Sequence, residues 1–125
     1  MEFPENLFFT RDHEWVSAKS GQVLMGVSAY AIEQLGDIVH VELPEEGKNF
    51  SMGDAIGTIE STKTVSDLYT PASGRVVETN KKIENDPESI QGDPYDKGWL
   101  VKMNLDQEAK DLMTAKEYEN FIRES

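Results

Sequence analysis

Short apolar runs, many alternating with polar residues and bounded by turn residues, recur along most of the chain. Alternation with a period of two is typical of strands that bury one face. The pattern predicts about seven short strands, in residues 7–16 (two extended pieces around a polar turn at Arg11-Asp12), 22–27, 37–43, 55–61, 64–69, 75–79 and 99–103. In the 37–43 strand, one face is expected to carry Val39, Val41 and Leu43.

Two segments carry helical signals. Ser28 is a suitable N-cap for a short helix that runs to Leu35 and stops at Gly36. Near the C-terminus, residues 106–113 have a helical composition, and Thr114 with Glu117 matches a capping box. The apolar stripe that follows is expected to pack against the sheet, and it consists of Tyr118, Phe121 and Ile122. Residues 80–98, rich in Asn, Asp, Pro and Gly, are predicted to form a long surface loop.

Together these elements predict a mainly β fold. The expected architecture is a small barrel-sandwich hybrid of short antiparallel strands, with a short internal helix and a C-terminal helical segment. The 125 residues fit one domain, 1–125, with a β core over residues 1–104 and the helical segment over residues 105–125. Helix-rich and βαβ folds are disfavoured, because too little helical pattern lies between the strands.

The net charge is −12, from 24 acidic and 12 basic residues. It disfavours nucleic acid and anionic membranes as partners, since both are bound through Lys and Arg. An acidic surface fits docking on basic partner proteins, or serves only solubility. The chain has no cysteine, and we predict neither a catalytic residue nor a metal site. It also has no run of about 18 apolar residues that predicts a membrane span.

The segment 53–74 predicts a hairpin with a lysine at its tip. Thr62 and Lys63 stand where a tight turn normally takes Asn, Asp or Gly. A local rule that is broken at one point often marks a functional residue, although a solvated lysine in an ordinary loop would look the same. Alternation in both arms is imperfect. Ile56 and Ile59 fall on opposite faces of an ideal strand, as do Val65 and Leu68, so a bulge or burial of both faces is needed.

The hairpin resembles the attachment hairpin of the biotinyl/lipoyl domain family, and within it the glycine cleavage H-protein family. The hairpin motifs are Glu60-Ser61-Thr62-Lys63, Ser66-Asp67 and Pro71-x-Ser73-Gly74. The resemblance extends along nearly the whole chain. Further motifs that carry it are Thr10-x-x-His13-Glu14-Trp15-Val16, Gln34 to Val39 with Glu42-Leu43-Pro44, Asp93-Pro94-Tyr95 with Gly98-Trp99-Leu100, and Ala115-Lys116-Glu117-Tyr118. The residues beside the lysine are threonines, whereas a biotin carrier has methionines there.

The resemblance implies a non-catalytic carrier with lipoic acid bound covalently to Lys63. Such a carrier takes the aminomethyl group of glycine from a pyridoxal-phosphate glycine decarboxylase (P protein) to a tetrahydrofolate-dependent aminomethyltransferase (T protein). Dihydrolipoyl dehydrogenase (L protein) then reoxidises the lipoyl arm. A lipoate ligase or lipoyl transferase attaches the arm, and the carrier is expected to be a monomer.

The resemblance also suggests roles for other residues. Glu60, Ser61 and Asp67 flank the tip, where they would belong to the surface recognised by the attaching enzyme or be ordinary strand polarity. Glu14 is the family-based candidate for contact with the loaded arm, or a structural side chain. His13 is expected to be structural. Gly57 and Gly74 are expected to permit close packing or sharp turning of the backbone near the hairpin.

Three alternatives remain at this point. An H-like relay would use the same hairpin to donate lipoate to 2-oxoacid dehydrogenases. A hydrolase built on His13 lacks a supporting nucleophile motif. A pure interaction module would leave Lys63 unmodified. The acidic N-terminus resembles neither a secretory signal nor a transit peptide, so the expected compartment is the cytoplasm, or the mitochondrial matrix for a processed eukaryotic form.

Overall fold

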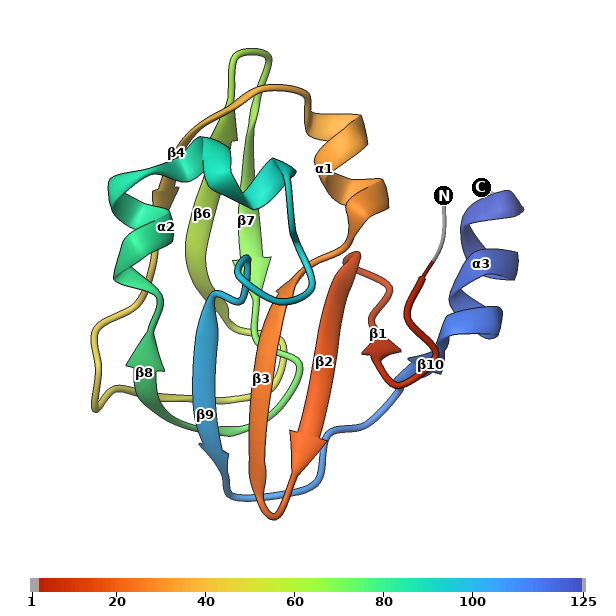
Figure 1. Ribbon diagram of the computed structural model, residues 1–125. Coiled ribbons are helices and arrows are strands. Elements are labelled where there is room, and N and C mark those ends of the chain that lie inside the picture. Colours follow the sequence, from red (N-terminus) through yellow and green to blue (C-terminus); the bar gives the residue numbers. More distant parts are fainter. Residues whose placement is uncertain (1–2, 125) are drawn as a thin grey trace.

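The computed structural model describes residues 3–124, which form two antiparallel sheets (Figure 1). The larger sheet has the strand order β10-β1-β2-β3-β9-β8-β5. Its strands are β1 (Phe8–Phe9), β2 (Glu14–Lys19), β3 (Gln22–Val27), β5 (Asn49–Phe50), β8 (Gly74–Thr79), β9 (Val101–Leu105) and β10 (Met113–Thr114). The smaller sheet has the order β4-β6-β7, with β4 (Ile38–Glu42), β6 (Ala55–Ser61) and β7 (Val65–Tyr69).

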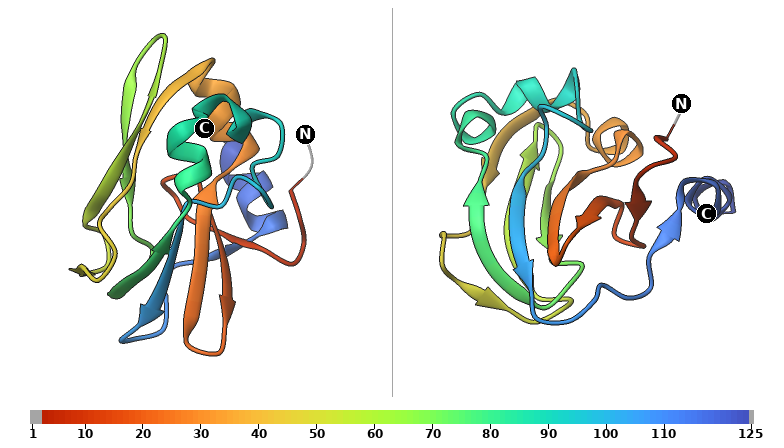
Figure 2. Two further views of the ribbon diagram at one scale, coloured as in Figure 1. Left: turned by 60° about the vertical axis from the view of Figure 1, so that its left-hand side comes forward. Right: turned by 60° about the horizontal axis from the view of Figure 1, so that its bottom comes forward.

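The main core lies between the two sheets, which face each other without closing into one barrel over residues 3–124 (Figure 2). Inward side chains of both sheets fill it, among them Val23, Met25, Ile59, Leu68 and Met103. Each is at most 1% exposed, so the hydrophobic effect holds the sheets face to face. The mainly β, barrel-sandwich prediction is confirmed.

Two helices begin and end where local signals place them. α1 (Ala29–Leu35) has Ser28 as N-cap, whose hydroxyl accepts from the amide of Ala31, and it ends at Gly36. α3 (Ala115–Arg123) starts with the complete capping box between Thr114 and Glu117. None of the helices within residues 3–124 is long and apolar enough to cross a membrane.

A second, aromatic core joins α3 to the edge of the larger sheet. Tyr118 is fully buried and stacks on Phe9 of β1, with ring centroids 4.6 Å apart. Trp15 of β2 belongs to the same cluster, and Phe121 and Ile122 pack on its border. The predicted packing of the C-terminal apolar stripe is therefore confirmed.

The prediction of a long surface loop over residues 80–98 was wrong. The segment contains α2 (Lys81–Asn85) and a 3-10 helix, η1 (Pro87–Gln91). Ile83 and Ile90 are at most 1% exposed and anchor these two turns in the main core. The strand expected at 99–103 begins two residues later, at Val101.

The prediction of helical structure from the composition of residues 106–113 was also wrong. No helix forms there, and Asp111 has a backbone φ of 58°, in the left-handed region that ends a right-handed helix. Only Leu112 of this segment packs on the main core. Without an apolar stripe to bury, helical propensity alone does not hold so short a segment.

The prediction that Val39 shares a face with Val41 was wrong. A register shift between Ile38 and His40 makes Val39 the extra residue of a β-bulge in β4. Ile38 and Val41 are buried, whereas Val39 is 47% exposed. In β6 the needed bulge is present between Ala55 and Gly57, which brings both isoleucines of that strand into the core.

Candidate functional site

The β6–β7 hairpin projects beyond the body of the molecule and carries Lys63 at its tip (Figure 1). Its two strands pair from Ala55–Tyr69 up to Glu60–Val65. Gly57 lies against β4, where a side-chain carbon would collide with the carbonyl oxygen of Glu42. Gly74 likewise leaves no room for a Cβ beside the carbonyl oxygen of Asn104. The expected close backbone packing near the hairpin is thus present at both glycines.

The turn at the tip is shaped by Ser61. Its side chain is 4% exposed, and its hydroxyl accepts from the amides of Lys63 and Thr64, each at 3.2 Å. The same hydroxyl donates to the carbonyl of Thr64 at 3.3 Å. A serine hydroxyl thereby satisfies a turn that has no Asn, Asp or Gly, by the mechanism of a side-chain-stabilised turn.

Lys63 is exposed, and within residues 3–124 its amine forms no ion pair. Its aliphatic stem passes the C-terminal end of α1, where a Cβ on Gly36 would stand 3.1 Å from Cε of the lysine. Gly36 is also in the left-handed region, with φ of 91°. A hydrogen bond also joins the tip to the residue after Gly36, because the amide of Thr62 donates to the carbonyl of Asp37 at 3.0 Å. The tip is therefore fixed to the end of α1 while its amine stays accessible.

The opposite end of the hairpin meets a buried carboxyl group. Glu14 is 2% exposed, and its Oε2 accepts from the amide of Tyr69 at 2.7 Å, while its Oε1 accepts from the hydroxyl of Thr10 at 3.3 Å. Burial raises the pKa of Glu14 to about 8, and the Tyr69 amide opposes that rise. A carboxyl held in this way gains most from a cationic partner.

The remaining predicted residues lie on the surface of the hairpin. Asp67 is exposed and accepts from the hydroxyl of Tyr69 at 3.5 Å, whereas Glu60 is half-buried between His40 and Val65. Glu14 borders a hollow of about 230 Å³ that also includes Asp12 and Lys110. The structure therefore gathers Glu60, Ser61 and Lys63 at one end of the hairpin, and places Glu14 at the other.

Sequence reasoning missed a chain of polar side chains that connects His13, the residue before Glu14, to Ser28 at the start of α1. Nδ1 of His13 lies 2.8 Å from the hydroxyl of Tyr118, which lies 2.7 Å from the hydroxyl of Ser28. Burial lowers the pKa of His13, which favours the neutral ring. The unusual φ of 67° at His13 agrees with a structural role for this residue, and no local sequence pattern predicts contacts across 105 residues.

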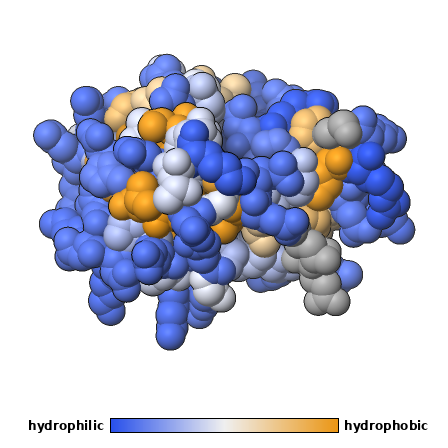
Figure 3. Space-filling model, turned by 90° about the horizontal axis from the view of Figure 1, so that it is seen from above, coloured by the Kyte–Doolittle hydropathy of each residue, from blue (hydrophilic) through white to orange (hydrophobic). Residues whose placement is uncertain are grey.

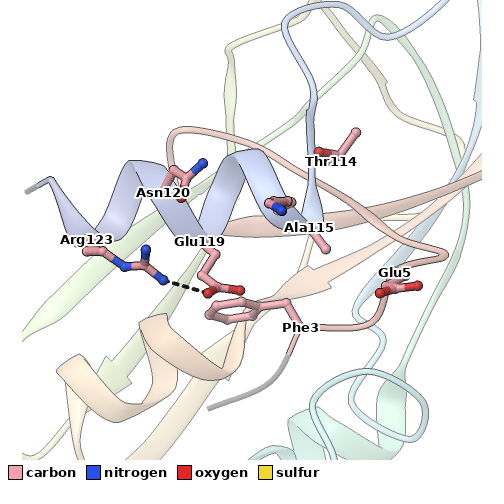
Figure 4. Close-up of a pocket in the computed structure, with 8 residues that line it drawn as sticks. Phe3, Glu5, Thr114, Ala115, Glu119, Asn120 and Arg123 are labelled. Atoms are coloured by element: carbon pink, nitrogen blue, oxygen red, sulfur yellow. Dashed lines mark hydrogen bonds and ion pairs between the residues drawn. The ribbon is translucent and has the colours of Figure 1, made fainter.

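Another hollow, of about 510 Å³, lies away from the hairpin between the N-terminal segment and α3 (Figure 4). Phe3 closes one side, and the ion pair between Arg123 and Glu119, at 2.7 Å, closes another. Its walls hold no buried titratable group, so this hollow offers nothing comparable to the buried carboxyl of Glu14.

Comparison with known proteins decides the family. The model of the family described as glycine cleavage H-protein matches residues 7–125. The chain belongs to the glycine cleavage H-protein family. A glycine cleavage system H protein of Listeria monocytogenes (strain HCC23) is 47% identical, covering 98% of this chain and 99% of the relative. One of Staphylococcus haemolyticus is 44% identical, covering 99% of this chain and 100% of the relative.

A solved structure agrees with the sequence relatives. The crystal structure of a glycine cleavage system H protein from Mycobacterium marinum superposes with a TM-score of 0.91 and 42% identity, covering 97% of this chain and 99% of that one. Membership of the H-protein family confirms the predicted role as a lipoyl carrier of the glycine cleavage system, which is not itself a catalyst. It also implies work alongside the other enzymes of that system.

Proposed function

We propose that Lys63 carries the lipoyl group of this H-family carrier, in an amide bond to its Nζ. The support is the geometry of the tip, where an exposed amine stands on a turn fixed by Ser61 and by the carbonyl of Asp37. When bound, the lipoyl group supplies a cyclic disulfide that accepts an aminomethyl unit on one sulfur. The chain itself supplies reach, position and shelter.

The attachment is an acyl transfer to a deprotonated amine. Nζ of Lys63 attacks the carbonyl carbon of an activated lipoyl adenylate, the new C–N bond forms, and the bond to AMP breaks. The amine proton passes to solvent. The exposed tip suits this reaction, because an attaching enzyme must bring the activated carbonyl onto the amine. Ser61 would assist through the shape of the turn, whereas Glu60 and Asp67 are the surface residues available for recognition.

Glu14 is the proposed partner of the aminomethyl group after loading. A protonated amine beside this buried carboxyl would lower its raised pKa and form a charge-assisted hydrogen bond. The carboxyl already accepts from Tyr69 at the end of β7, so it is held in a defined orientation. An arm that starts at Lys63 would have to lie along β7 to reach it, because the two residues stand at opposite ends of that strand.

The proposed partners are a glycine decarboxylase, an aminomethyltransferase, dihydrolipoyl dehydrogenase and a lipoate ligase or lipoyl transferase. Tethering raises the effective concentration of the arm at each of these enzymes.

We also propose that residues 1–125 act as one carrier domain. The bacterial relatives favour the cytoplasm over the mitochondrial matrix as its compartment. Lipoyl relay to 2-oxoacid dehydrogenases is the second candidate, since it would need the same hairpin.

The test is intact mass with peptide mapping after incubation with lipoic acid, ATP and a lipoate ligase. We expect one lipoyl increment, located on the peptide that contains Lys63. Absence of modification under conditions that lipoylate a known H protein would overturn the proposal. A lipoyl-transfer assay to a 2-oxoacid dehydrogenase domain then measures the relay directly.

A further inference from the structure

Two exposed valines lie on the outer face of the smaller sheet, immediately below the tip. Val65 is 57% exposed and pairs directly with Glu60, which in turn pairs with His40. Directly paired residues of neighbouring strands share a face, so these three side chains form a row across the sheet. Val39, at 47% exposed, extends the row, because the bulge sets Val39 and His40 together opposite Glu60.

The bulge is what turns Val39 outward. An unbroken strand would bury Val39 on the same face as Val41, as the alternating sequence predicts. Strands in a sheet are roughly 4.8 Å apart, so the valines of β4 and β7 stand roughly 10 Å from each other across β6. They flank Glu60, and Val65 is two residues from the lysine. Bulges that redirect a side chain are common beside functional sites.

The stretch of sequence that contains this row is acidic. Between residues 28 and 74 the chain has eight acids and two bases, Lys48 and Lys63. Seen from the end that carries the tip, small apolar groups are set in a mainly hydrophilic surface (Figure 3). An interface of this kind fits a partner with an apolar centre and a basic rim.

We propose that Val39, Glu60 and Val65 form the docking surface of the enzyme that attaches lipoate, an inference that rests on the proposed modification of Lys63. The short reach of the unmodified lysine decides which enzyme needs this surface. The bare amine is four methylenes from the backbone, so the attaching enzyme has to cover the residues next to the tip. Enzymes that act on the loaded carrier work at the far end of a longer arm and can bind elsewhere.

The test is steady-state lipoylation with preformed lipoyl adenylate and a lipoate ligase, comparing the wild-type chain with the double variant Val39→Thr/Val65→Thr. Threonine keeps the β-branched shape, so the sheet is preserved while two apolar contacts are lost. We expect KM for the carrier to rise about tenfold, which corresponds to about 1.4 kcal/mol, with kcat unchanged. Met52→Gln, which changes another exposed apolar side chain, is the control and should match wild type.

Three outcomes would overturn the docking surface. An unchanged KM in the double variant, with the wild type fully lipoylated, would refute it while leaving the modification of Lys63 intact. A fall in kcat alone would mean that the turn was disturbed. An equal loss of activity when the lipoylated double variant is offered to glycine decarboxylase would assign the valines to general docking. Failure of the wild type to be lipoylated would instead overturn the proposed function itself.

Discussion

The two ends of strand β7 differ in almost every physical respect. Lys63, just before the strand, is exposed, and its turn is held by one serine hydroxyl. Glu14 meets the strand at Tyr69, where it is buried, and its pKa is raised to about 8. The contrast fits the proposed division of work, in which the Lys63 end is reached by other proteins and the Glu14 end receives the amine of the loaded arm.

The strongest way to break this contrast is to remove the amine at the exposed end. Lys63→Arg keeps the positive charge, but a guanidinium does not accept the lipoyl group. We expect complete loss of lipoylation, with the folded structure unchanged because the side chain is exposed. Intact mass and circular dichroism measure the two effects. Lys48→Arg, the other base of the 28–74 region, is the matched control and should be lipoylated normally.

At the buried end, Glu14→Gln should change how stability depends on pH. The folded pKa of about 8 lies above the ordinary value of 4.5, so the folded state binds more protons between these two values. The wild type therefore loses stability as pH rises from 4.5 to 8. Relative to it, the variant should gain roughly 2–4 kcal/mol over that window.

Denaturant titrations at several pH values measure that difference. Glu60→Gln, which removes a carboxyl group near the exposed end, is measured alongside as the control. Parallel curves for Glu14→Gln and wild type would show that the carboxyl at position 14 titrates normally. The contrast between the two ends of β7 would then disappear.

Ser61→Ala should loosen the exposed end without affecting the buried one. The variant loses the hydroxyl that the amides of Lys63 and Thr64 share, at a cost of about 1–2 kcal/mol. We expect faster hydrogen exchange at these two amides and slower lipoylation. Hydrogen exchange at the amide of Tyr69, at the buried end, should not change. Ser61→Thr retains a hydroxyl and should restore much of the protection. Unaltered exchange in the alanine variant would contradict the role given to the serine.

The smallest expected effect concerns the support of the buried end. Tyr118→Phe removes the hydroxyl that lies between His13 and Ser28, but leaves the aromatic packing on Phe9. A loss of about 1 kcal/mol in the free energy of unfolding is expected. Tyr30→Phe on α1 provides a comparison, and thermal unfolding measures both. Equal stability of the two variants would mean that this polar chain contributes nothing.

Local rules were sufficient for much of the fold. The caps of α1 and α3 depend on residues three positions apart, and both formed as the sequence predicts. Local reasoning failed where burial decides. Ile83 and Ile90 are single apolar residues in a polar stretch, so no periodic pattern reveals the two short helices that they anchor. The bulge that exposes Val39 is likewise set by pairing with β6.

In the candidate site, too, some features follow from local sequence and others depend on contacts between distant residues. Lys63 breaks a turn rule within its own hairpin, although family resemblance was needed to give that signal a meaning. The burial of Glu14 and its bond to Tyr69 join residues 55 positions apart, which no local pattern encodes. The sequence predicts that Ser61 either belongs to the recognised surface or is ordinary strand polarity, and it does not indicate a role in the turn. The structure adds that role, because the hydroxyl bonds to the backbone of the tip.

The most direct test of the account is to load the carrier. The lipoylated chain is incubated with glycine and a glycine decarboxylase of the pyridoxal-phosphate class, and its intact mass is measured over time. We predict that one aminomethyl unit is gained on the lipoylated Lys63 peptide, and that it is lost sooner by hydrolysis in Glu14→Gln than in wild type. A lipoylated chain that gains no such unit, while a known H protein does, would contradict the account.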